Sequence, residues 1–129
     1  MKRVVLDASA LMTFFENRPG AQKVEDLIHL AVAGKRHLLM SVVNWGEVYY
    51  ATWRAQGPGM ARKIVEDIAK LPIDLVPADL ELTLLAAELR ASHKLPYTDC
   101  FAASLASHRK ASLATSDLDF ASVQKIDIL

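Results

Sequence analysis

Cysteine is nearly absent from this 129-residue chain, which contains only Cys100. A disulfide framework needs cysteine pairs and a thiolate zinc cluster needs several cysteines, so both are excluded. No apolar run approaches the roughly 20 residues of a membrane-spanning helix. The opening MKRVVLDASALM resembles a signal peptide for only a few residues, because Asp7 interrupts the apolar run. We therefore interpret this segment as a strand and expect a cytoplasmic protein.

The chain also lacks an excess of either charge and several well-known enzyme motifs. Fifteen Lys and Arg residues balance fifteen Asp and Glu residues, which excludes a uniformly basic, histone-like nucleic-acid binder. No glycine-rich phosphate loop with a lysine is present, and no G-x-S-x-G, which excludes a P-loop nucleotidase and argues against a serine hydrolase.

Apolar residues make up 52% of the sequence, which excludes intrinsic disorder. The length suits one domain, residues 1–129, that folds without a covalent or metal staple.

Short apolar segments alternate with segments of helical spacing along the whole chain. The predicted strands are Val4–Leu6, His37–Met40, Ile73–Val76, Ala111–Thr115 and, at a sheet edge, Lys125–Ile128. The predicted helices are Ala8–Glu16, a helix around Val24–Ala31 that Gly34 ends, Val42–Gln56, Ala61–Lys70, a helix around Leu82–Leu89, and Asp99–Arg109. The strand segments are apolar and too short to be helices, and helices connect them. This alternation predicts an α/β fold with a mainly parallel sheet covered on both faces.

Four acidic residues fall where the predicted strands end or the following helices begin. Asp7 directly follows the first strand, and Glu47 lies early in the helix after the second. Asp99 begins the helix that leads into the fourth strand, and Asp117 lies two residues beyond Thr115 at the end of that strand. Ligands of open α/β sheets bind beyond the carboxyl ends of the strands. The fold is therefore expected to bring these four distant residues together.

Each acid taken alone has a simpler explanation. Asp7 or Asp99 could cap a helix N-terminus, because a carboxylate accepts hydrogen bonds from the free N–H groups there. Glu47 could be a solvated helix residue, and Asp117 could form a turn, with Asp119 a competitor for its role. The joint pattern of four acids at one edge, each beside an apolar segment, favours a common site.

Four neighbouring carboxylates repel one another, and at least one takes up a proton unless a counter-charge is present. A divalent cation removes the conflict, and hard oxygen ligands select Mg²⁺ or Mn²⁺ over zinc. Such a site suits phosphodiester hydrolysis, in which one or two ions generate hydroxide from water and stabilise charge on the phosphorus oxygens.

The four acids and their surroundings resemble the PIN-domain ribonucleases, in particular the VapC-like toxins of prokaryotic toxin–antitoxin pairs. The segments that carry the resemblance are VVLDASAL, SVVNWGEV, LPYTDCFAASLA and LATSDLDF. The resemblance implies a three-layer α/β/α sandwich and magnesium- or manganese-dependent cleavage of RNA. It assigns catalysis and metal binding to Asp7, Glu47, Asp99 and Asp117, with Asp119 close to the fourth position.

The resemblance also implies supporting residues and partners. A hydroxyl residue two positions after the first acid supports the site in this family, and here it is Ser9. Thr115 is expected to act in the same way beside Asp117, although each hydroxyl could instead make a local backbone hydrogen bond. The implied partners are the RNA substrate, an antitoxin protein and a second copy of the chain.

Two features of the predicted helix 42–56 are less specific. Arg54 lies seven residues after Glu47 on the same helical face, where it could reach a phosphate or simply be exposed. Trp45, Tyr49 and Trp53 form an aromatic stripe on another face, which either packs into the core or makes a protein contact. We predict that at least one of the three lies at a subunit or antitoxin contact.

Two other functions remain open from the sequence alone. A PIN-like module could act only through protein contacts, although four intact acids argue against this. A phosphotransfer domain of the haloacid-dehalogenase type needs a second acid two residues after the first. This chain has Ser9 at that position, which argues against such a domain.

Overall fold

The computed structural model describes residues 1–117 and 127–128, and Asp119 lies outside these residues. The strands are β1 (Lys2–Leu6), β2 (Arg36–Ser41), β3 (Ile73–Val76), β4 (Ser112–Ala114) and β5 (Asp127–Ile128). The helices are α1 (Ala8–Phe15), α2 (Ala21–Val32), α3 (Val42–Gln56), α4 (Pro58–Ala69), α5 (Leu80–Ser92) and α6 (Tyr97–Arg109). Each predicted strand and helix is matched by one of these elements, with boundaries that differ by a few residues.

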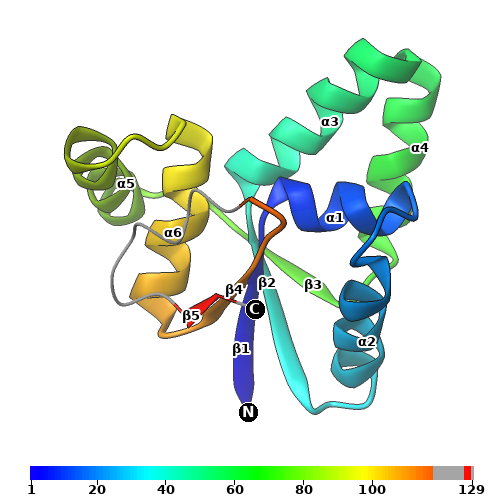
Figure 1. Cartoon of the computed structure of the whole chain (residues 1–129), viewed down its shortest axis with the longest axis horizontal. Helices are drawn as coiled ribbons and strands as arrows, with labels where there is room; N and C mark the ends of the chain where they lie inside the picture. Colours follow the sequence, from blue (N-terminus) through cyan, green and yellow to red (C-terminus); the bar gives the residue numbers. More distant parts are fainter. Residues whose placement is uncertain (118–126, 129) are drawn as a thin grey trace.

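The strands form one sheet in the order β3-β2-β1-β4-β5, and every neighbouring pair is parallel. Of the predicted edge strand Lys125–Ile128, Asp127–Ile128 is confirmed as a strand beside β4, and Lys125 and Ile126 lie outside the described residues. Because the strands are parallel, their carboxyl ends share one edge of the sheet, which is the upper edge in Figure 1. The acids that follow β1 and β4 therefore lie at the same edge.

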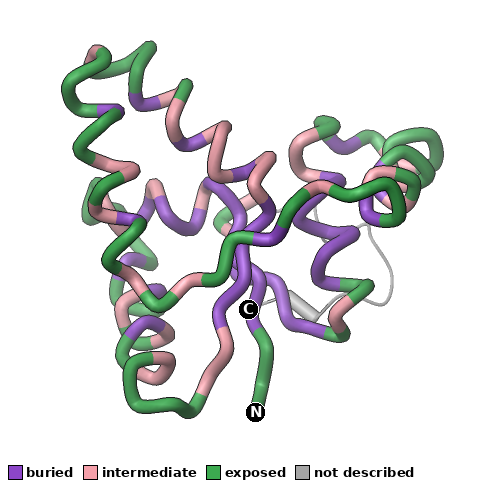
Figure 2. Tube along the Cα trace, turned by 180° about the vertical axis from the view of Figure 1, so that it is seen from behind, coloured by how far each residue is buried: buried purple, intermediate pink, exposed green. Residues whose placement is uncertain are grey.

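Helices cover both faces of the sheet, which confirms the predicted α/β fold with three layers (Figure 1). Side chains alternate along β1, so Val5 packs with α5 and α6, while Val4 and Leu6 pack with α1 to α4. β2 divides in the same way, with Leu39 on the first face and Leu38 on the second. Figure 2 shows the inner parts of these strands as buried tube, with exposed backbone at the helix tips and loops.

Helices α3 and α4 form an arm that projects from the sheet (Figure 1). Gly57 joins them with a φ of 90°, a conformation that residues with a side chain rarely adopt, and Pro58 begins α4. None of the helices within residues 1–117 and 127–128 has the length and apolar character needed to cross a membrane.

Candidate active site

Asp7 lies at the junction of β1 and α1 and has two roles there. It is the N-cap of α1, because Oδ1 accepts a hydrogen bond from the Ala10 backbone N–H at 2.9 Å. The side chain is almost completely buried, with 3% of the residue exposed. The capping explanation is therefore correct for Asp7, but it accounts for only one of the bonds that this carboxylate accepts.

Two hydroxyl groups bind the same carboxylate, one at each oxygen. Ser9 Oγ donates to Asp7 Oδ1 at 2.7 Å, and Thr115 Oγ1 donates to Asp7 Oδ2 at 2.5 Å. Thr115 Oγ1 also accepts from the Asp117 backbone N–H at 2.9 Å, and Ser9 Oγ accepts from the Ser116 backbone N–H at 3.0 Å. The loop after β4 is thereby tied to the start of α1, and Asp117 is placed beside Asp7.

Glu47 extends from the second turn of α3, a helix that begins directly after β2. Ser41 ends that strand and caps α3 by accepting from the Val43 backbone N–H. One turn before Glu47, the fully buried Asn44 donates from Nδ2 to Glu47 Oε1 at 3.4 Å and to the Thr98 carbonyl at 3.0 Å. Sequence reasoning missed Asn44, although its spacing of three residues from Glu47 places both on one helical face.

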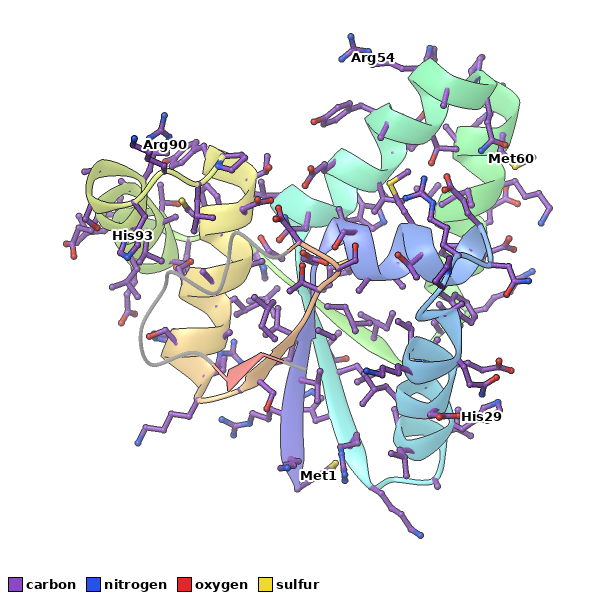
Figure 3. The ribbon with its side chains drawn as sticks, viewed as in Figure 1. Met1, His29, Arg54, Met60, Arg90 and His93 are labelled. Atoms are coloured by element: carbon purple, nitrogen blue, oxygen red, sulfur yellow. The ribbon has the colours of Figure 1, made fainter. Side chains whose placement is uncertain are left out.

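Asp99 lies in the first turn of α6, but it does not cap the helix. The N-cap position is Pro96, which makes no side-chain hydrogen bond to the helix, so the capping explanation for Asp99 is wrong. The Asp99 side chain instead forms a hydrogen bond with Asp117. Figure 3 shows side-chain oxygens gathered where the strands end, between the bases of α3 and α6 and the loop after β4.

The four carboxyl groups are close enough to change one another's ionisation. Burial is the main cause that raises the pKa of Asp99 to about 7, with the Asp117 hydrogen bond and the charges of Asp117, Glu47 and Asp7 adding to it. The pKa of Glu47 is also raised by burial and by the charge of Asp7, although the Asn44 hydrogen bond opposes this. Burial raises the pKa of Asp7 against the lowering effect of its hydrogen bonds.

The donor chemistry of this cluster fits a hard divalent cation. Within residues 1–117 and 127–128, the side chains do not already form a group of three or more metal ligands. The available donors are nevertheless carboxylate and hydroxyl oxygens, which Mg²⁺ and Mn²⁺ prefer. The raised pKa values reflect burial and mutual repulsion of the carboxylates. A bound cation would lower these pKa values, because it favours the charged form of each carboxylate.

The remaining predicted features of α3 lie away from this cluster. Figure 3 places Arg54 at the outer end of the helix, pointing away from the molecule. The buried face of α3 consists of Asn44, Val48 and Thr52, and not of the aromatic stripe.

The aromatic stripe forms a continuous and partly exposed surface. Trp45 and Tyr49 stack with ring centroids 6.1 Å apart, and Tyr49 contacts Trp53 at 5.9 Å. Trp45 packs partly against the core, whereas Trp53 is 44% exposed. The explanation that the whole stripe packs into the core is therefore wrong.

Comparison with protein families gives one match over nearly the whole chain. Residues 4–126 match the model of the PIN domain. A search of curated proteins found no match.

Solved structures of similar fold align with this chain over nearly its whole length and over nearly their own. The chain is similar to a chain of the Rickettsia felis VapBC2 complex bound to a promoter DNA fragment, with a TM-score of 0.80, 15% identity, and 98% and 97% of the two chains covered. It is similar to a chain of DNA-bound VapBC from Salmonella typhimurium, with a TM-score of 0.76, 17% identity, and coverage of 100% and 98%. It is also similar to VapC20 of Mycobacterium tuberculosis, a toxin that cleaves the sarcin–ricin loop, with a TM-score of 0.72, 14% identity and 92% of each chain covered.

Proposed function

The chain belongs to the PIN domain family, and we propose on this basis that it is an endoribonuclease dependent on Mg²⁺ or Mn²⁺ and the toxin of a toxin–antitoxin pair. The observation that carries the proposal is the convergence of Asp7, Glu47, Asp99 and Asp117 at the carboxyl edge of the sheet. Similarity in fold to VapC20, whose structure is described as that of a sarcin–ricin loop-cleaving toxin, supports RNA as the substrate class.

The four carboxylates would hold the cation, which supplies activation of water and stabilisation of charge on phosphate oxygens. Ser9 and Thr115 hold the Asp7 carboxylate through hydrogen bonds to both of its oxygens, so this acid is oriented before any ligand arrives. The Thr115 hydroxyl also fixes the backbone of Asp117. Positioning of this kind keeps the donor oxygens in place without reorganisation during the reaction.

The partners are proposed on separate grounds. Similar chains occur in VapBC complexes from Rickettsia felis and Salmonella typhimurium, which supports an antitoxin partner. The partly exposed stripe of Trp45, Tyr49 and Trp53 is typical of a protein contact, because aromatic residues are enriched in interfaces. We propose that the chain is a homodimer in which this stripe meets a second subunit or the antitoxin. The cytoplasm stays the predicted compartment.

The test is cleavage of end-labelled RNA by the purified chain with Mg²⁺, with Mn²⁺ and with EDTA. We expect cleavage only with a metal, and none from Asp7→Asn. An asparagine still caps α1 through its side-chain oxygen, so this variant is expected to fold. Asp26→Asn changes an exposed acid on α2 and serves as the matched control, which should cleave like the wild type. Equal cleavage by wild type and Asp7→Asn, or cleavage in EDTA, would refute the proposal.

A further inference from the structure

The least expected residue of the core is an asparagine. Asn44 is fully buried, on the same face of α3 as Val48 and Thr52. Its Oδ1 is the one buried side-chain nitrogen or oxygen among the described residues that has no hydrogen-bond partner. An unpaired buried acceptor costs free energy, and a leucine of similar size would avoid that cost. The amide must therefore be explained by what its other end does.

The Nδ2 end of Asn44 connects two different elements. Its two N–H groups are directed to two acceptors, the Thr98 carbonyl at 3.0 Å and Glu47 Oε1 at 3.4 Å. Thr98 belongs to the first turn of α6 and immediately precedes Asp99. Among buried side chains, an amide of this length is suited to donating to two acceptors from one atom without adding a charge. The orientation of the amide follows from the bonds, since a flipped group would direct Oδ1 at the two acceptors.

We propose that Asn44 is a positioning residue, which holds Glu47 against the first turn of α6 and so sets the second acid of the cluster relative to the third. This inference rests on the proposed function, because it concerns how the same site is arranged for its cation. Asn44 is expected to touch neither cation nor substrate, and to act only through Glu47 and the backbone beside Asp99. Helix α3 follows β2 and α6 leads into β4, so a bond between the two helices fixes a distance that neither helix sets alone. The Thr98 side chain also forms a hydrogen bond with Glu47, so Asn44 and Thr98 hold this acid together, and Asn44 adds the bond to the Thr98 backbone.

The experiment compares Asn44→Leu with Thr52→Val, a polar-to-apolar change at a buried position two turns along the same helix face. For each chain we would measure the melting temperature in EDTA, the Mn²⁺ affinity by calorimetry, and kcat and KM for RNA cleavage. We expect Asn44→Leu to melt close to wild type, because removal of the unpaired oxygen offsets the loss of the two donated hydrogen bonds. It should bind Mn²⁺ at least about tenfold more weakly than wild type, and its kcat should fall by a larger factor than its KM changes. Thr52→Val should keep the wild-type Mn²⁺ affinity.

The outcomes separate positioning from simple packing. If Asn44→Leu melts lower but binds Mn²⁺ as tightly as wild type, Asn44 only joins the two helices and the inference is overturned. If Asn44→Leu does not fold, Asn44→Ser replaces it, since serine is too short to reach both acceptors, and the same Mn²⁺ comparison decides.

Failure of the proposed function gives a different pattern. A wild-type chain that binds Mn²⁺ but leaves RNA intact, with weaker binding in the Asn44 variant, overturns the ribonuclease proposal and supports the positioning role. Cleavage by both chains with equal Mn²⁺ affinity overturns the positioning role alone.

Discussion

Replacing Asp99 by asparagine should stabilise the metal-free protein at neutral and alkaline pH. Asp99 has an ordinary pKa of 3.8 in the unfolded chain, and burial together with the neighbouring acids raises it to about 7 in the folded protein. Between these pH values the folded chain keeps a proton that the unfolded chain has released, so the free energy of unfolding falls as the pH rises through this window. The asparagine of the Asp99→Asn variant cannot titrate, so the variant escapes this loss.

The size of the effect follows from the two pKa values. The difference between 3.8 and about 7 corresponds to roughly 4 kcal/mol if the whole interaction is counted. Because Asp99 is partly exposed, screening by solvent reduces this to on the order of 1–2 kcal/mol. For a domain of this size we expect the melting temperature to rise by about 3–8 °C at pH 8.

The assay is thermal unfolding of both chains in EDTA between pH 4 and pH 8, with Asp26→Asn as the control for loss of an exposed acid. The stability difference between Asp99→Asn and wild type should be near zero at pH 4 and largest at pH 8. A variant that melts lower than wild type at pH 8 would show that Asp99 stabilises the fold. A difference that does not change with pH would show that the raised pKa of Asp99 is not its cause, and either result refutes the reasoning.

Three further predictions address the metal, the hydroxyl support and the aromatic stripe. Mn²⁺ at 100 times its Kd should stabilise wild type by about 2.7 kcal/mol and Asp7→Asn far less; equal melting shifts would place the metal elsewhere. Thr115→Val removes the hydroxyl bonded to Asp7 and should lower the free energy of unfolding by about 1 kcal/mol and weaken Mn²⁺ binding, whereas Thr83→Val on α5 should leave Mn²⁺ binding unchanged. Sedimentation should find a wild-type dimer at micromolar concentration that Trp53→Ala weakens; a wild-type monomer, or a Trp53→Ala dimer that loses much thermal stability, would contradict the interface.

Much of the site could be predicted because its signals are local. An acid directly after an apolar strand, as at Asp7, lies at the carboxyl edge of a parallel sheet in any arrangement of the strands. The hydroxyl at Ser9 is two residues away, and its bond to Asp7 needs only the first turn of α1. Thr115 and Asp117 follow β4 in the same way, so the predicted support from Thr115 needed only β1 and β4 to be neighbours.

The features of α3 show where local reasoning fails. Periodicity identified the helix and placed Val48 and Thr52 in one apolar arc with the aromatic stripe. It did not indicate which part of that arc meets the sheet, because both the aromatic stripe and the adjoining face of Asn44, Val48 and Thr52 are possible core faces. The structure buries the second face, and this depends on how α3 packs against α1, α6 and the sheet. The outer position of Arg54 has the same origin, because the arm formed by α3 and α4 carries its end away from the sheet.

The sequence by itself determined the elements and the class of fold, because strand and helix periodicity are properties of neighbouring residues, and it placed Asp7 directly after a strand. That the four acids form one site stays a prediction from the sequence. Only the tertiary structure decided which strands are adjacent, that Asp7 both caps α1 and joins the cluster, and that Asn44 connects Glu47 to the first turn of α6 beside Asp99. These facts depend on contacts between segments far apart in the chain, whose geometry is set by packing of the whole domain and leaves no periodic pattern in the residues themselves.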